Sequence, residues 1–152
     1  MSDIEIRGVE DMLRLSKALK NAGRLDTRRE LHKGIQKAAR PLIPAARAAA
    51  LTTLPQRGGL AGKVARAPMR VQVRTGRDPG VRIVVGKDRS GARAANHGLI
   101  RHPVFGHRDR WVDQRVPADW FDGAMRRNAP AVRPEIARAM DRVVDKIVRG
   151  AR

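Results

Sequence analysis

Residues 69–85, MRVQVRTGRDPGVRIVV, decide the fold class of this chain. Apolar and polar residues alternate through the first six positions, which is the two-residue period of a strand with one buried face. The segment 76–80, GRDPG, has the composition of a turn, and the same period returns after it. The pattern predicts a β-hairpin over residues 69–86 with strands Met69–Thr75 and Val81–Val85, which leaves three cations on one face: Arg70, Arg74 and Arg82.

The chain before this hairpin has the periodicity of helices. Residues 8–23 repeat apolar side chains at helical spacing, and the capping-box sequence at 27–30, TRRE, predicts the start of a second helix at Thr27. Pro41 and Pro44 should interrupt that helix because each lacks a backbone N–H, and the alanine-rich residues that follow can resume it. Residues 1–50 are therefore predicted to be helical.

The remaining segments complete an α+β plan of one domain, residues 1–152, with a C-terminal helix packed on a small antiparallel sheet. Residues 51–68 contain the sequence LPQRGGLAG and are predicted to form a linker region. Residues 87–102 lack a usable period and are predicted to form a basic loop. Residues 103–121 hold every aromatic side chain of the chain, and residues 133–149 have one apolar face, which predicts the last helix.

The amino-acid composition limits the size of the hydrophobic core and the kinds of reactive site that the chain can form. Leu, Ile, Val and Phe make up 34 of 152 residues, about 22%, which permits only a thin core. Without cysteine the chain forms no disulfide, thiolate zinc site or thiol nucleophile. No apolar run exceeds four residues, so neither a membrane span nor a secretory signal is predicted.

The charge is strongly basic and unevenly distributed. Lys and Arg number 33 against 15 Asp and Glu, a formal charge of +18. Residues 51–102 carry 11 basic and 2 acidic groups, or +9, which is half of the excess. A basic surface that faces a partner or DNA is therefore expected in this third of the chain, with the candidates Arg70, Arg74, Arg82, Lys87, Arg89, Arg93 and Arg101.

Catalytic motifs receive little support. None of the three serines lies in a G-x-S-x-G elbow, and the sequence has no phosphate-binding G-x-x-x-x-G-K-[ST] loop. Three histidines and two aspartates could be imagined as the metal ligands of a nuclease: His97, His102, His107, Asp109 and Asp113. Their spacing is not that of one helix face, and neighbouring arginines (Arg108, Arg110, Arg115) are expected to pair with the aspartates. No catalytic, cofactor or metal site is predicted, and a metal-dependent nuclease remains the least favoured alternative.

Nucleic-acid binding is the main alternative because of the charge. However, no helix-turn-helix with a polar recognition face is apparent, and no strand is expected to carry exposed aromatics that stack on bases. The four aromatics lie near Pro and Gly residues, which favours a packed corner of the core.

One segment resembles a known family. Residues 102–114, HPVFGHRDRWVDQ, and 116–121, VPADWF, are similar to the tail-component family of long-tailed phages, the tail-completion, head–tail joining and tail-terminator proteins, in the version found in phages of actinobacteria. The family commonly shows R-H-P-V-F-G-N-R-x-x-W-V-x-Q, then a proline and a Trp-Phe pair before the last helix. Here Arg101 supplies the first arginine, and His107 replaces the usual asparagine. Upstream, Arg47, Pro55 and Gly58–Leu60 match a looser family pattern, although Arg57 stands where Thr is usual.

The resemblance implies a non-catalytic virion protein of the phage neck, assembled in the host cytoplasm, with no cofactor and no membrane contact. Such proteins form a ring, expected to be six-fold, that completes or terminates the tail tube and joins it to the head connector. The implied partners are further copies of the chain, the adjoining tail-tube and connector proteins, and genomic DNA in the channel. The motif residues are expected to anchor the last helix or contact a neighbouring subunit: His102, Pro103, Phe105, Gly106, Trp111, Trp120 and Phe121.

Overall fold

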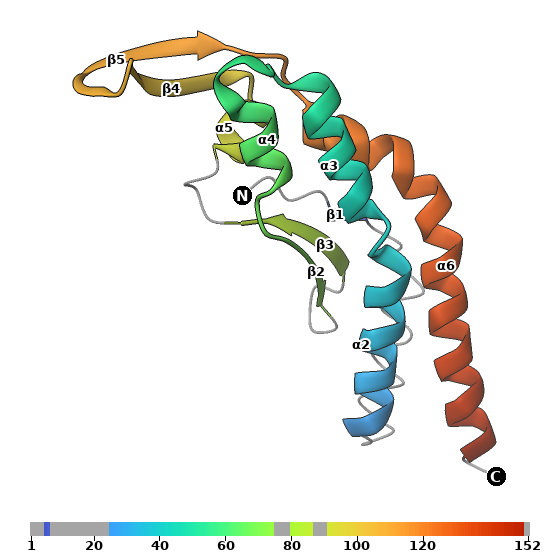
Figure 1. Cartoon of the computed structure of the whole chain (residues 1–152). Coiled ribbons are helices and arrows are strands. Elements are labelled where there is room, and N and C mark those ends of the chain that lie inside the picture. Colours follow the sequence, from blue (N-terminus) through green and yellow to red (C-terminus); the bar gives the residue numbers. More distant parts are fainter. Residues whose placement is uncertain (1–4, 7–24, 75–79, 87–90, 151–152) are drawn as a thin grey trace. The chain divides into compact units, whose positions relative to one another are not determined.

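A computed structural model describes residues 5–6, 25–74, 80–86 and 91–150 of the chain (Figure 1). The fold is α+β, with two helices before the sheet, antiparallel strands, and a C-terminal helix packed on the sheet, which confirms the predicted class. In chain order the elements are β1 (Glu5–Ile6), α2 (Leu25–Ala39), α3 (Leu42–Thr53), the 3₁₀ turn η1 (Arg57–Gly59), α4 (Leu60–Ala65), β2 (Met69–Arg74), β3 (Gly80–Val85), α5 (Ala92–Asn96), β4 (Leu99–Val104), β5 (His107–Arg115) and α6 (Trp120–Gly150).

The chain divides into two compact units, where the sequence predicts one domain. Of the described residues, the first unit contains those within 43–70 and 84–127, and the second contains those within 3–42, 71–83 and 128–152. Each unit is therefore assembled from stretches that are distant in the sequence.

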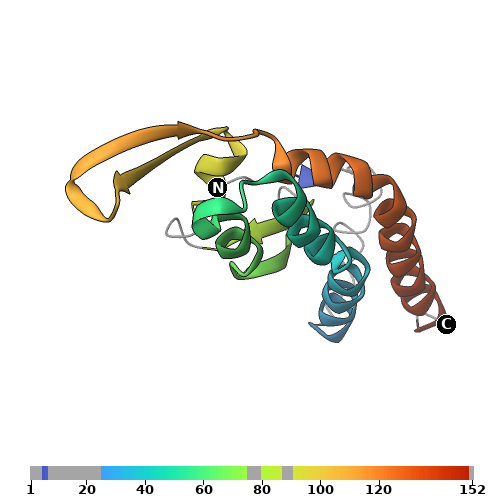
Figure 2. The same cartoon turned by 45° about the horizontal axis from the view of Figure 1, so that its top comes forward.

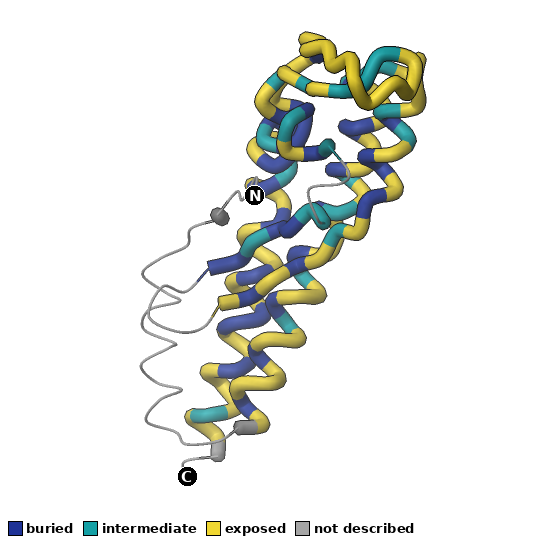
Figure 3. Tube along the Cα trace, turned by 90° about the vertical axis from the view of Figure 1, so that its left-hand side faces the viewer, coloured by how far each residue is buried: buried dark blue, intermediate teal, exposed yellow. Residues whose placement is uncertain are grey.

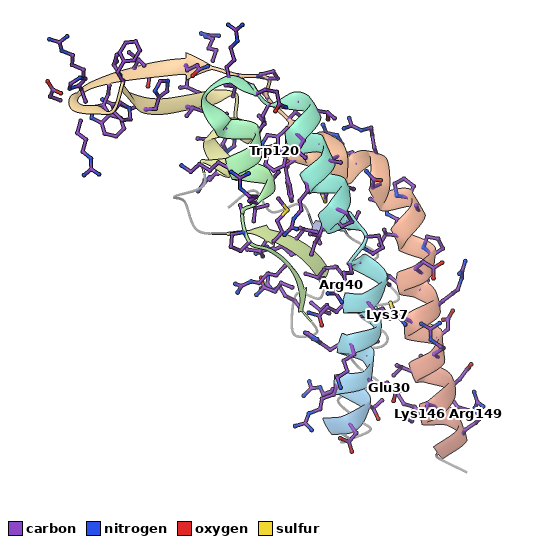
Figure 4. All side chains as sticks on the ribbon, in the orientation of Figure 1. Glu30, Lys37, Arg40, Trp120, Lys146 and Arg149 are labelled. Atoms are coloured by element: carbon purple, nitrogen blue, oxygen red, sulfur yellow. The ribbon has the colours of Figure 1, made fainter. Side chains whose placement is uncertain are left out.

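In the second unit, α2 packs against the C-terminal part of α6. A Cβ added at Gly34 would lie 3.3 Å from the Cβ of Ala139, so the two helices approach closely at this point. Leu31 and Ile35 of α2 are buried, as are the apolar residues of α6 that the sequence placed on one face, Ile136, Met140 and Val143; Val144 of that predicted face is exposed. Lys146 and Glu30 form an exposed ion pair across the two helices (Figure 4).

The three-stranded sheet has the order β1-β3-β2. Strand β1 pairs antiparallel with β3, with Glu5 opposite Arg82. Only residues 75–79 connect β2 to β3, which is too short for a parallel crossover, so these neighbours are also antiparallel. In β2, Val71 and Val73 are buried while the intervening side chains are exposed. The predicted hairpin is confirmed, and its turn lies outside the described residues.

The helices on either side of Pro41 begin and end at residues that differ in part from the prediction. The predicted helix 8–23 lies outside the described residues. Helix α2 ends before Pro41, as expected, and α3 begins at Leu42 with Pro44 in its first turn. The first four N–H groups of a helix have no intrahelical acceptor, so Pro44 removes no hydrogen bond there.

Four segment predictions are wrong. Residues 1–50 are not helical throughout, because Glu5–Ile6 form strand β1. Residues 51–68 are not a linker, since they complete α3 and form η1 and α4, in which Ala61 and Val64 are buried. Residues 87–102 are not one loop, because 92–96 form α5 and β4 begins at Leu99. The last helix begins at Trp120 instead of residue 133 and continues through Pro130 and Pro134.

Candidate interaction site: the β4–β5 hairpin

Strands β4 and β5 form a two-stranded antiparallel sheet of their own (Figure 2). Their pairing runs from Leu99 opposite Arg115 to Pro103 opposite Trp111, and then shifts so that Val104 lies opposite His107. The two residues between Val104 and His107 are Phe105 and Gly106, which form the turn at the tip. The shift leaves residues 108–110 of β5 without cross-strand partners, and the Trp111 indole N–H donates to the carbonyl of Arg108 at 2.8 Å across this bulge.

Backbone hydrogen bonds fix the root of the hairpin. The N–H of Val116 donates to the carbonyl of Gly98 at 3.0 Å, and the N–H of Asp119 donates to the carbonyl of Asn96 at 2.9 Å. Gly98 has a φ of +82°, and a Cβ there would lie 3.0 Å from the Cβ of Ala118. Both the backbone conformation and the close approach therefore require glycine where β4 leaves α5.

The side chain of Asn96 ties this root to α6. It is buried, and its Oδ1 accepts the N–H of Phe121 at 2.9 Å and the N–H of Asp122 at 3.3 Å. These are first-turn donors of α6, which have no acceptor within their own helix. Asn96 thus caps α6 from another element, in place of the usual residue just before the helix.

Trp120 and Phe121 form the apolar part of the root. Their exposed fractions are 2% and 0%, and their rings meet edge to face at 5.5 Å. The indole N–H of Trp120 donates to the carbonyl of Ala92 in α5 at 3.3 Å (Figure 4). The burial of this pair agrees with the expectation that it anchors the last helix.

Phe105 and Trp111 do not anchor the core of this chain, contrary to the packed-corner prediction. Phe105 is 97% exposed at the tip, and Trp111 is 49% exposed on β5. Aromatics that are close in sequence were expected to pack together, but the turn at residues 105–106 points this part of the motif away from Trp120 and Phe121. The prediction that no strand carries exposed aromatics is wrong for the same reason.

The residues of the hairpin are exposed or half-buried (Figure 3). Apolar side chains occur on both of its faces. Directly opposed residues share a face. One face therefore contains Leu99, Arg101, Pro103, Trp111, Asp113 and Arg115, and the other contains Ile100, His102, Val112 and Gln114. On the first face the Arg101 guanidinium lies 6.0 Å from the Trp111 ring centroid, and on the second His102 Nε2 lies 3.1 Å from Gln114 Oε1. All nine residues of β5 are exposed, so neither face is a core.

The two aspartates of β5 have no ion-pair partner among the described residues. Asp113 lies opposite Arg101, but that guanidinium is placed over Trp111. Asp109 lies in the bulge between two arginines and pairs with neither. The expectation that these aspartates pair with Arg108, Arg110 or Arg115 is therefore wrong.

The other predicted basic residues lie on several elements. Arg70 and Arg74 are exposed on one face of β2, and Arg93 is exposed on α5. Arg82 of β3 is half-buried opposite Glu5, so it is less accessible than the sequence suggested. Lys87 and Arg89 lie outside the described residues.

The histidines of the alternative nuclease site are not gathered into a ligand set. His97 follows the last turn of α5, His102 contacts Gln114, and His107 begins β5. In the described ranges no three His, Asp or Glu side chains come together in a group that could hold a metal. No helix there is long and apolar enough to cross a bilayer.

Comparison of the chain with protein-family models, with curated proteins and with solved structures finds no match, so the functional argument rests on the hairpin and its root. Sequence analysis did not identify Asn96 or Gly98, which position that hairpin. The available signal was the tripeptide Asn96–Gly98, since Asn and Gly are common at helix ends. The acceptor role of Asn96 involves residues 25 positions away, and no local pattern reveals it.

Proposed function

We propose that this chain is a structural, non-catalytic protein of a phage neck. It forms a ring that completes or terminates the tail tube and joins it to the head connector. The observation that supports this best is the division of the HPVFG–WV–WF segment into two parts. Trp120 and Phe121 are buried at the root, while Phe105 and Trp111 face solvent on a hairpin. A motif arranged in this way suits a protein that acts by contact.

The hairpin also favours an assembly over a monomer. A two-stranded sheet with both faces in water is marginally stable, and its two outer edges can pair with another chain. Neighbouring subunits that cover the hairpin would stabilise the sheet and pair or shield its open edges. Most soluble assemblies of identical chains have closed symmetry, and a ring is the closed form of a head-to-tail contact.

The charge of such a ring needs a counter-charge, from acidic faces of adjoining proteins or from DNA in the channel. Six copies would carry 6 × 18 = +108 formal charges, and salt screens their repulsion only beyond about 8 Å. We propose that most of the excess in residues 51–102 faces acidic surfaces of adjoining tail or connector proteins. A minority of these side chains would line the channel and meet genomic DNA. Arg70 and Arg93, both exposed and without an ion pair in the described part of the chain, are candidates for these contacts.

Deleting the gene from the phage or prophage that carries it tests the proposed function. The expected result is filled heads and complete tails that remain unjoined in electron micrographs, with rescue by the wild-type gene. Particles that assemble normally without the gene would contradict the proposal. The neighbouring genes provide a second criterion, because portal, capsid and tail-tube genes should flank this one.

A nucleic-acid-binding protein is the second candidate, and the exposed Trp111 with Arg101 above it is the observation that favours it. Aromatic side chains that stack on single-stranded bases contribute about 1–3 kcal/mol per base. Titration of labelled single-stranded DNA with the Trp111→Ala variant separates the candidates. A neck protein should bind DNA weakly and lose no affinity on this substitution, whereas a loss of tenfold or more would favour the second candidate.

A further inference from the structure

The β4–β5 hairpin concentrates the exposed apolar surface of the described chain. Of the seven large apolar side chains that are exposed in the described part of the chain, four lie between residues 99 and 115: Leu99, Phe105, Trp111 and Val112. Exposed apolar side chains gathered on one element, with charged residues between them, are typical of contact surfaces in soluble proteins. Trp and Arg, which adjoin on this hairpin, are also enriched at the centres of interfaces.

Phe105 has two energetically unfavourable features, its exposure and its backbone conformation. It is 97% exposed, and its φ of +46° is in the left-handed region that a bulky residue rarely adopts. With Gly106 at +83°, it forms a two-residue turn with positive φ at both positions, which Asn-Gly would occupy more easily. Strain together with full exposure at one aromatic residue indicates a contact outside the chain.

The charges of the hairpin are mixed, with four arginines and two aspartates between residues 99 and 115. Asp109 and Asp113 are exposed and have no ion pair within the described ranges. The chain as a whole has more than twice as many cations as anions, 33 against 15. A second copy therefore offers these carboxylates many cations.

We propose that the β4–β5 hairpin is the arm by which one copy of this chain docks onto the next. Phe105 is the apolar anchor of the contact, and Asp109 and Asp113 pair with cations of the neighbouring copy. The inference rests on the proposed function in one respect, namely that the chain works as an assembly of identical copies. It adds which surface makes the contact.

The mixed charge of the arm argues against nucleic acid as the occupant. The bulge reads Arg108-Asp109-Arg110, and Asp113 lies on the same face as Trp111. Both carboxylates would face phosphates if this side lay on DNA. Apolar side chains on both faces likewise suit burial between protein surfaces better than contact with one groove.

Sedimentation velocity of the full-length protein over a dilution series tests the arm. Phe105→Asn removes the apolar anchor and places a residue that accepts positive φ at the same position. We expect the dissociation constant of the assembly to rise about tenfold or more, as for a central interface residue. At a concentration where both proteins are dissociated, the melting temperature of the variant should equal or exceed that of the wild type, whereas loss of a core side chain would lower it.

Val148→Gln is the matched control, because it removes another exposed apolar side chain, 55% exposed on α6, and should leave association unchanged. Asp109→Asn combined with Asp113→Asn should weaken association, most strongly at low salt. Binding of a labelled DNA duplex is measured in parallel. If the hairpin binds phosphates, the two Asp→Asn substitutions would tighten DNA binding while self-association stays constant, and the proposal is overturned.

Two results distinguish failure of the arm from failure of the ring. If the wild-type chain assembles and Phe105→Asn assembles equally well, the hairpin is not the contact, although the proposed ring stands. If the wild-type chain remains monomeric at every concentration and salt, both the arm and the ring are wrong.

Discussion

Replacing Asn96 with Ala measures how far the short helix α5 stabilises the start of α6. The substitution removes the Oδ1 that accepts the N–H groups of Phe121 and Asp122 at 2.9 and 3.3 Å. The first donor is buried and would lose its partner, which costs about 1–3 kcal/mol, while the longer second bond contributes little. Loss of a helix cap costs about 0.5–2 kcal/mol. We therefore expect the free energy of unfolding to fall by about 2 kcal/mol.

Thermal unfolding followed by circular dichroism provides the assay. For a chain of this size about 2 kcal/mol corresponds to a decrease in melting temperature of about 4–8 °C. Asn96→Asp keeps the acceptor and adds a negative charge at a helix N-terminus, so its decrease should be smaller. Gln114→Ala removes an exposed amide whose bond to His102 lies on the hairpin, and it should change stability by less than about 0.5 kcal/mol. An Asn96→Ala protein that melts with the wild type would refute the capping role.

Three further substitutions test the packing by chemical denaturation. Trp120→Ala should lower the free energy of unfolding by about 3–5 kcal/mol because the side chain is 2% exposed, and a variant that unfolds like the wild type would remove Trp120 from the core. Gly98→Ala should lower the free energy of unfolding by about 1–3 kcal/mol, because φ is +82° and the new Cβ would lie 3.0 Å from that of Ala118. A variant as stable as the wild type would show that the backbone at the root of the hairpin can shift to accept the methyl group. Gly34→Ile should destabilise by about 1–3 kcal/mol because the α2–α6 approach leaves 3.3 Å to the Cβ of Ala139, and a gain in stability would mean that the helices separate readily.

The sequence predicted those elements in which periodicity and burial agree. Val71 and Val73 alternate with exposed polar residues, and one face of β2 is buried, so the two-residue period was informative. The stripe of α6 was predicted for the same reason, although its start was missed. The predicted start at residue 133 is wrong, because the helix begins at Trp120, continues through Pro130 and Pro134, and forgoes two backbone hydrogen bonds there.

The β4–β5 hairpin could not be predicted from periodicity. Both of its faces carry apolar and polar residues, so no alternation identifies the strands. Their register comes from the root, where Gly98 and Asn96 make contacts with residues that follow β5. The short helices α4 and α5 were missed because their buried residues are mostly alanines, which give little hydrophobic signal. The resemblance drew attention to this segment, but exposure of Phe105 follows only from the turn that the fold creates.

Electron cryo-microscopy of the neck of the phage particle whose genome encodes this chain tests the central claim most directly. The account predicts a closed ring of copies between the tail tube and the head connector, with Phe105 of each copy buried against the next copy. The cations of residues 51–102 should lie mainly near acidic side chains of adjoining proteins. A neck without this chain, or one in which its copies touch only DNA and leave every Phe105 in solvent, would contradict the account.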